Sequence, residues 1–543
     1  MLRREFLQAG ATATIAINAA RPPVRGLPPS RPPAFPPSLA IVGDTPIEEA
    51  TIASLQAAME SGALTSAQLT QAYLDRIAAI DQHGPALNSV IEANPEALAI
   101  AQGLDAERKS RGLRGPLHGI PVLVKDNLDS GDRMLTTAGS LAMATAPAPR
   151  DSTVVDKLRA AGAVLLGKTN LSEWANFRSS RSTSGWSGRG GLTLNPYSLD
   201  RNACGSSSGT GAGISANLAT VGIGTETDGS ITCPASFCGL VGLKPTVGLV
   251  SRAGIVPISA TQDTAGPMTR TVTDVAILLG VIAGADPRDA ATAAAASHAE
   301  TNYRRFLDAD GLKGARLGVV RGYFGYQPGV DRLAEEALAL LKDKGAILVD
   351  PVTPPADKTF GDAEYQVLLY EFKAGLTDYL ATRGADFPMK TLKDLIAWNE
   401  ANKDREMPWF GQEIFLQAEA KGPLTEPAYL KARALCRKQS RTLGIDKVMT
   451  DHRLDALVAP TAQAAFTTDL VTSDHFLGSA TTLAAVAGYP HITVPSGMVS
   501  GLPVGFSFFG RAWSEPVLLK LAYAYEQATR HRKPPEYLAT IGA

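Results

Sequence analysis

The sequence predicts an α/β protein built on one large mixed, mostly parallel, twisted sheet that is covered by helices on both faces. The first reason is that short, continuous apolar runs alternate with segments of helical periodicity, as expected for strands buried on both faces. The second is the content of 51 Gly and 36 Pro in 543 residues, which indicates many tight turns. The runs expected to form strands are 120–124, 163–167, 219–224, 316–320, 456–460, 491–495 and 503–510.

Capping residues predict two helices near the start of the body. Thr65 and Ser66 offer an N-cap, and the apolar residues that follow recur at helical spacing. Those apolar residues are Leu69, Tyr73, Ile77 and Ile80. Asn94 followed by Pro95 predicts a second helix, with proline at its first position, that extends through Leu104.

The body of the chain, residues 45–540, contains no stretch with the composition of a linker, so we expect a single domain. Residues from about 360 to 450 are charged and show helical periodicity without strand-like runs. We therefore expect a helical lobe beside the main sheet.

The N-terminus is typical of an export signal. Arg3 and Arg4 precede a Phe-Leu pair and the mildly apolar segment ATATIAINAA, which ends in small residues. This order predicts a twin-arginine signal over residues 1–20, followed by a proline-rich spacer over residues 21–40. We expect the protein to be exported to the periplasm or secreted. No run elsewhere approaches the ~20 apolar residues of a membrane span, so none is predicted.

Composition argues against several classes of function. A net charge of -1 gives no field that would favour nucleic acid. The sequence shows no metal or cofactor motif, and GTGAG at 209–213 lacks the full GxGxxG spacing of a dinucleotide loop. Four cysteines are too few for a disulfide scaffold, so buried free thiols are predicted. The alternative, for an exported protein, is a disulfide from Cys204 to one of the others.

Three segments carry residues suited to amide chemistry. LHGIPVLVKDN places Lys125 at the end of an apolar strand. CGSSSGTGAG places Ser206 in a glycine-rich loop whose serine hydroxyls are expected to cap a helix that extends to about Leu218. GTETDGS presents Ser230 on a turn beside free backbone N–H groups. Taken singly, the segments also fit a surface lysine, a phosphate loop or helix cap, and a polar turn.

Taken together, the three segments resemble the amidase signature family. The family pattern is a Gly/Ser-rich loop, a second serine 24 residues later (230 − 206 = 24), and an upstream lysine after GIP and an apolar run. The resemblance covers essentially the whole body of the chain. Segments 167–178, 248–259 and 512–527 are similar to bacterial peptide amidase in particular, a family member that removes the C-terminal amide of peptides.

The resemblance implies a role for each of these residues. Ser230 would be the nucleophile, Ser206 a bridging serine held by a cis peptide bond, and Lys125 the final base. The oxyanion hole would be formed by the backbone N–H groups of Thr227, Asp228, Gly229 and Ser230. Asp228 stands where many relatives have glycine, which leaves backbone donation intact although the local turn need not be the same.

The chemistry implied for these residues is physically consistent. A free lysine titrates near ~10.4, so Lys125 must be neutral to act as a base, and burial lowers the pKa of an amine. The Ser206 hydroxyl both donates and accepts, so it can relay a proton, and Ser–Lys pairs are a known variant of the serine triad. No histidine is required, and His118 and Lys168 are assigned structural roles.

The substrate remains open at this stage. The first hypothesis is hydrolysis of the C-terminal amide of peptides, with release of ammonia through an acyl-enzyme. An aryl acylamidase or a fatty-acid amide hydrolase would use the same three residues. A glutamyl-tRNA amidotransferase catalytic subunit is disfavoured by the export-like N-terminus, and a non-catalytic binding protein by the presence of all three residues. Because a neutral Lys125 leaves no evident cation for a carboxylate, amidated termini should be preferred. Side-chain preference and oligomeric state are not set by the sequence.

Overall fold

The computed structural model describes residues 40–354 and 360–542. The predicted signal at 1–20, and all but the last residue of the predicted spacer at 21–40, lie outside the described residues. Within the described ranges, no helix is long and apolar enough to cross a membrane.

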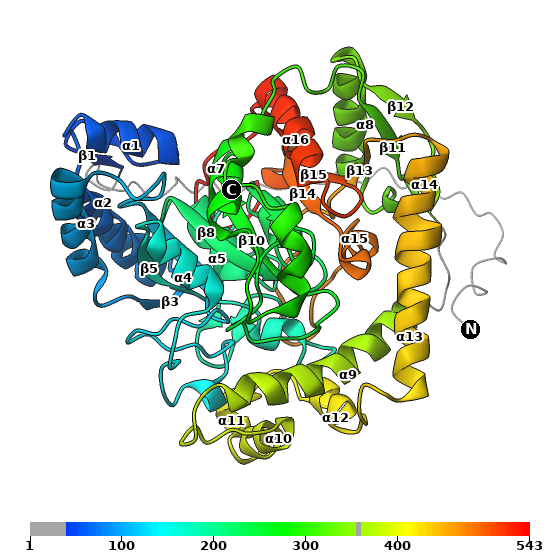
Figure 1. The fold of residues 1–543 in the computed structure, drawn as a ribbon, viewed down its shortest axis with the longest axis horizontal. Coiled ribbons are helices and arrows are strands. Elements are labelled where there is room, and N and C mark those ends of the chain that lie inside the picture. Colours follow the sequence, from blue (N-terminus) through cyan, green and yellow to red (C-terminus); the bar gives the residue numbers. More distant parts are fainter. Residues whose placement is uncertain (1–39, 355–359, 543) are drawn as a thin grey trace, which may run out of the picture.

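Within the described residues, eleven strands form one mixed sheet that is flanked by helices (Figure 1). In spatial order the strands are β12 (Ile347–Val349), β11 (Arg316–Val319), β13 (Ala456–Pro460), β15 (Leu502–Phe509), β14 (His491–Val499), β9 (Val241–Lys244), β10 (Thr264–Thr269), β8 (Val221–Glu226), β4 (Pro121–Lys125), β5 (Val164–Thr169) and β3 (Val90–Ala93). Two separate ladders of two-residue strands pair β1 (Ile41–Val42) with β2 (Thr45–Pro46) and β6 (Trp186–Ser187) with β7 (Gly191–Leu192). The prediction of a large mixed sheet in a single domain is confirmed.

The expectation that the sheet is mostly parallel needs correction. Four neighbouring pairs are parallel, β12–β11, β11–β13, β8–β4 and β4–β5. The other six pairs are antiparallel. A continuous apolar run indicates that a strand is buried, but its direction depends on the connection. For example, β14 and β15 are joined by the two-residue turn Ser500–Gly501, which forces an antiparallel hairpin.

Helices cover both faces of the sheet. On one face, α5 (Ser208–Ser215) approaches β8 so closely that a Cβ on Gly222 would lie 2.6 Å from the Thr210 side chain. The helix α6 (Thr232–Phe237) packs on the same face, since a Cβ on Gly242 of β9 would lie 2.6 Å from Ala235. On the other face, Tyr525 of α16 (Glu515–Thr529) packs against Phe506 and Phe508 of β15.

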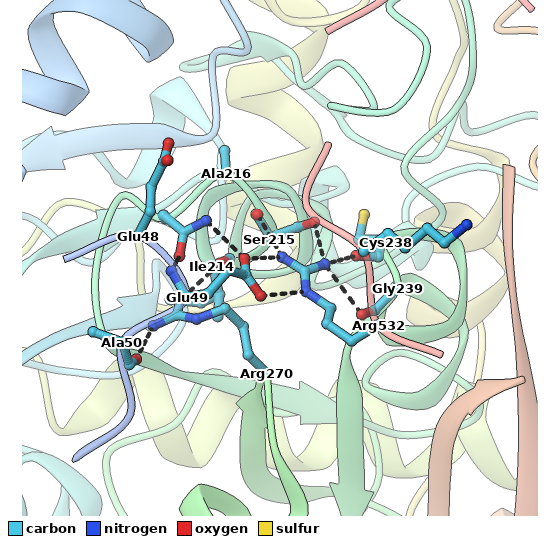
Figure 2. A network of polar contacts seen from close by, with 12 residues as sticks. Glu48, Glu49, Ala50, Ile214, Ser215, Ala216, Cys238, Gly239, Arg270 and Arg532 are labelled. Atoms are coloured by element: carbon cyan, nitrogen blue, oxygen red, sulfur yellow. Dashed lines mark hydrogen bonds and ion pairs between the residues drawn. The ribbon is translucent and has the colours of Figure 1, made fainter. Parts of the chain in front are cut away.

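Arg270, which is buried, and Arg532, which is partly buried, satisfy carbonyl groups at the C-terminal end of α5 (Figure 2). Arg270 donates to the carbonyls of Ile214 and Ala50, and Arg532 donates to the carbonyl of Ser215. Arg532 also forms an ion pair of 2.9 Å with Glu49. Cations at the C-terminal end of a helix complement its dipole and its unpaired carbonyls. These contacts therefore fix the position of the helix that follows the serine-rich loop.

The N-terminal helices are α1 (Ile52–Glu60), α2 (Ser66–Arg76) and α3 (Ala97–Arg111). Thr65 caps α2 as predicted, and the helix continues into a π-helical turn over Ile77–Gln82. The α3 helix begins later than predicted, at Ala97, because the Asn94 side chain accepts from the backbone of Glu96 in a local turn that precedes the helix. Three further helices pack around the sheet, α4 (Thr153–Ala160), α7 (Val272–Ile282) and α8 (Pro328–Asp343).

Residues 360–450 contain helices and no strand in the described structure. The helices are α9 (Phe360–Ala381), α10 (Leu392–Ala401), α11 (Lys403–Glu406), α12 (Glu413–Glu419), α13 (Pro427–Arg437) and α14 (Asp446–Asp451). Figure 1 shows α9 and α13 running along the lower and right margins of the molecule. Phe372 and Phe415 of this lobe pack with Trp174 and Phe177 in an apolar cluster separate from the main core. The lobe thus has its own core, anchored on a loop of the sheet domain. The short α15 (Thr482–Ala487) follows β13.

Candidate active site

Lys125 ends β4 and lies fully buried, with its amine directed at the serine-rich loop. Its Nζ is 2.7 Å from Ser206 Oγ and 2.9 Å from Thr225 Oγ1. Asn127 Nδ2 donates to the same Thr225 hydroxyl over 3.0 Å. Two side chains thus fix the position of the amine, and the structure brings together two of the three predicted catalytic residues.

Burial lowers the pKa of Lys125 to about 7 because the low-dielectric interior disfavours the charged amine. Asp263 and Glu226 oppose this effect by their negative charge. Burial also raises the pKa of each of these two carboxyls, that of Asp263 to about 6. The amine is therefore substantially neutral at and above neutral pH, as a base requires.

Ser206 lies in the loop before α5, and its peptide bond with Gly205 is cis, as the family resemblance implies. Its carbonyl accepts from the backbone of Ser172 over 3.0 Å. A Cβ on Gly205 would lie 2.2 Å from Ser172 Oγ, so only glycine fits beside Ser206. The neighbouring hydroxyl of Ser207 does not cap α5 as expected but donates to the carbonyl of Thr225 over 3.1 Å, because β8 lies directly opposite.

Ser230 lies on the turn after β8, where Gly229 adopts a φ of 79°. The carbonyl of Ser230 accepts from the backbone of Ser207 over 3.1 Å, which ties the two serine-bearing loops together. Among residues 40–354 and 360–542, no group hydrogen-bonds to the Ser230 hydroxyl. The hydroxyl is therefore available to a substrate in the pocket that Ser230 lines.

The turn that carries Ser230 also presents free backbone donors. Within the described structure, no acceptor is bonded to the N–H groups of Thr227, Asp228, Gly229 or Ser230. The Asp228 carboxylate accepts from the hydroxyls of Thr481 and Thr482, at 2.6 and 2.7 Å, which anchors the turn from the side. The aspartate therefore leaves the four amides open, and such preorganised donors can stabilise an oxyanion.

Asp228, Gly229 and Ser230 line a pocket of about 530 Å³. Its wall includes Tyr365 of α9 and Ile414 of α12, so the helical lobe closes one side. Two carboxyl groups, Asp228 and Asp474, line it, and no Lys or Arg is found among the described lining residues. Burial raises the pKa of both carboxyls. The pocket is therefore rich in hydroxyl and carboxyl groups and offers no cation.

The prediction of free thiols is wrong for two of the four cysteines. Cys204 and Cys233 form a disulfide, with their Cα atoms 6.1 Å apart, and both line the pocket. The loop before α5 and the helix after Ser230 bring the two side chains together, which the spacing along the chain does not reveal. Cys238 and Cys436 are free and buried, as expected.

Sequence reasoning missed three polar residues of the site. Thr225 accepts from the amine of Lys125, and Asn127 donates to the Thr225 hydroxyl. Asn176 lines the pocket with a buried side-chain oxygen that no described group satisfies. Asn127 lies only two residues after Lys125 and could have been inferred from that proximity. Thr225 lies in the GTETDGS segment and Asn176 in the segment 167–178, but only their position in space shows what they contact.

The residues assigned structural roles lie outside the pocket. His118 Nε2 is 2.9 Å from the carbonyl of Leu104, on the side of α3. The buried amine of Lys168 donates to the carbonyl of Leu128 and to the Thr136 hydroxyl. No group of three or more His, Cys, Asp or Glu side chains suited to a metal ion is found in the described part of the chain.

Fold and site define a hydrolase of the amidase class, and comparison with known proteins bears this out. The amidase family profile matches residues 68–519 of the 543-residue chain. A probable amidase of Arabidopsis thaliana is 43% identical over 507 residues, with 91% of this chain and 92% of that protein covered. The chain belongs to the amidase family and is an amidase.

Two solved structures and one further relative are also similar to this chain. Native peptide amidase from Stenotrophomonas maltophilia has a TM-score of 0.86 at 52% identity, with 90% of this chain and 99% of that chain covered. An amidase family protein of Bacillus anthracis has a TM-score of 0.81 at 38% identity, with 90% and 92% covered. A glutamyl-tRNA(Gln) amidotransferase component of Chloroflexus aurantiacus is 36% identical over 504 residues, with 90% and 99% covered. The predicted resemblance to the amidase signature family and to peptide amidase is confirmed.

Proposed function

We propose that this amidase hydrolyses the C-terminal carboxamide of peptides and releases ammonia through an acyl-enzyme on Ser230. The observation that carries the proposal is the contact of 2.7 Å between Lys125 Nζ and Ser206 Oγ. It is buried next to Gly205, which lines the same pocket as Ser230, and no Lys or Arg is among the described residues of that lining. The 52% identity with a solved peptide amidase supports the same substrate class.

The proposed chemistry begins with attack by Ser230. Its Oγ adds to the amide carbonyl carbon while its proton passes to Ser206, whose own proton passes to the neutral amine of Lys125. The Ser230–Ser206 hydrogen bond is proposed to form when substrate binds, since such contacts often tighten only in the complex. The four free amides of the 227–230 turn stabilise the oxyanion.

Collapse of the tetrahedral intermediate returns the proton. Lys125 gives it back through Ser206 to the leaving nitrogen, the C–N bond breaks, and ammonia departs. Water then attacks the acyl-enzyme, gives a proton along the same path, and releases the peptide carboxylate with Ser230 restored. No net proton remains on Lys125 after a turnover.

The pocket favours an uncharged amide over a carboxylate. In either protonation state, Asp228 and Asp474 offer a terminal carboxylate no positive partner, whereas a carboxamide can donate to them. Burial of a terminal carboxylate without a partner in this pocket costs well over ~1.4 kcal/mol of binding free energy. A difference of that size changes an affinity by a factor of ten.

We therefore expect ammonia release from a short peptide amide to be at least about tenfold faster than removal of the last residue from the same peptide with a free C-terminus. Both products are measured on matched peptides at equal concentration. Equal rates would contradict the proposed substrate. Anilides and fatty amides, assayed in parallel, test the alternative amidases with the same catalytic residues.

The pH dependence of kcat/KM should follow the titration of Lys125. Because the neutral amine is the active form, activity should rise about tenfold per pH unit below a pKa of about 7 and level off above it. Asp263 raises the pKa of Lys125 by its charge, so Asp263→Asn should move the rise to lower pH. A profile that falls with rising pH through this range would rule out Lys125 as the base.

A further inference from the structure

The disulfide joins the two loops that carry the candidate catalytic serines. Cys204 lies two residues before Ser206, and Cys233 lies three residues after Ser230. The disulfide therefore links the segment that carries Ser206 to the segment that carries Ser230, within a few residues of each serine.

Both cysteines also belong to the wall of the substrate pocket. Their side chains are buried and pack in an apolar cluster with Phe237 and Phe466. Both residues line the same pocket as Ser230. Any movement of the two sulfur atoms therefore changes the shape of the space in which the amide must lie.

Hydrogen bonds also hold the segments that carry Ser206 and Ser230. The backbone of Ser207 donates to the carbonyl of Ser230 on the side toward α5. The backbone contacts of Cys204 are local, because its N–H donates to Asn202 Oδ1 over 2.7 Å and its carbonyl accepts from Ser208 Oγ over 2.5 Å. These local bonds shape the loop. Asn195 bridges it to the C-terminal end of α6 by donating to the carbonyls of Asn202 and Phe237, and the disulfide adds a covalent tie near the N-terminal end of α6.

We propose that the Cys204–Cys233 disulfide is a positioning element for Ser206 and Ser230, so that catalysis depends on its oxidised state. The inference rests on the proposed roles of the two serines. Two thiols cannot approach as closely as two bonded sulfur atoms, so reduction pushes the loops apart and disturbs the relay. Displacements of about 1 Å at a reacting centre can reduce rates by about 100-fold.

The test reduces the protein with a water-soluble phosphine. The phosphine attacks one sulfur, the S–S bond breaks, and hydrolysis gives two thiols and the phosphine oxide, so the phosphine supplies both electrons. Mass spectrometry after alkylation counts the thiols. We expect kcat for a peptide amide, and the rate at which a fluorophosphonate labels Ser230, both to fall by about 10- to 100-fold. Reoxidation should restore both, and thermal unfolding should remain cooperative above the assay temperature.

Three variants complement the reduction experiment, two that lack the disulfide and one that serves as a control. The double variant Cys204→Ser/Cys233→Ser should behave like the reduced protein and ignore the phosphine, and Cys204→Ala/Cys233→Ala should do the same. Cys436→Ser, which removes a free buried thiol on α13, should respond like the wild type. Full reduction with kcat and labelling unchanged within about twofold would overturn the proposal. Unfolding of the reduced protein and of both double variants would also overturn it, because the bond would then only stabilise the fold.

The labelling rate separates this proposal from the proposed function. If oxidised protein labels rapidly at Ser230 but releases no ammonia from peptide amides, the substrate assignment fails, and the disulfide proposal is judged on labelling alone. If the probe labels another residue, the assignment of Ser230 fails, and the positioning proposal fails with it.

Discussion

Replacing Ser230 with alanine should lower kcat for ammonia release from a peptide amide by at least about 10⁴-fold. Loss of the nucleophile removes the acyl-enzyme route, and serine hydrolases lose up to about 10⁶-fold when theirs is removed. The hydroxyl makes no hydrogen bond to a described group, so the fold should not depend on it. The measurement is kcat at saturating peptide amide, together with the thermal transition of the variant.

A matched control for this variant is Ser182→Ala. Ser182 lines the same pocket, but its hydroxyl donates to the carbonyl of Ser179 and lies outside the proposed relay. We expect its kcat to stay within about threefold of the wild type. Retention of more than a tenth of wild-type activity by Ser230→Ala would mean that another residue is the nucleophile. Mass spectrometry of a trapped acyl-enzyme would then locate that residue.

The second large effect is expected for Lys125→Met, which should lower kcat by roughly 10³-fold or more, the scale on which removal of a catalytic base acts in serine hydrolases. Methionine has a similar length and fills the buried space without an amine. Because the buried hydroxyls of Ser206 and Thr225 lose a partner, we expect some loss of thermal stability, so kcat is measured on the folded variant. The residual activity should also lose its rise through pH 7.

Lys168→Met provides the control for Lys125. Lys168 is also fully buried and also has its pKa lowered by burial, but it donates to Leu128 and Thr136 rather than to Ser206. Its replacement should reduce stability, because those two acceptors lose a partner, while kcat of the folded protein changes little. If both lysine variants lose kcat equally, the effect of Lys125 is structural and the proposed base is wrong.

Seven of the eleven strands of the sheet could be placed from the sequence, but the directions of the strands could not be predicted. All seven apolar runs coincide with strands, because burial on both faces selects continuous apolar residues. The strands of the large sheet that the sequence did not predict are β3, β9, β10 and β12. Each of them is either short or carries Gly, Pro or Lys. The strand β10, for example, reads TAGPMT and resembles a turn, yet it lies in the middle of the sheet.

For the site, motifs identified the candidate catalytic residues but not the residues that hold them in place. Lys125 and Ser206 are 81 residues apart and meet because the loop before α5 lies against the C-terminal end of β4. Thr225 contacts the amine from the end of β8, where nothing in the sequence distinguishes it from a strand residue. The pairing of Cys204 with Cys233 depends on loop geometry, and four cysteines allow several pairings.

The sheet and the helical lobe contribute different parts of the site, and this affects how the substrate preference of such an enzyme can change. The proposed proton path is built on β4, the loop before α5 and the turn after β8, whereas Tyr365 and Ile414 reach the pocket from helices with a core of their own. Substitutions at these two positions alter which amide fits without touching the hydrogen bonds of Lys125. Natural drift or laboratory selection can therefore explore new substrates on the lobe while the reaction itself is preserved.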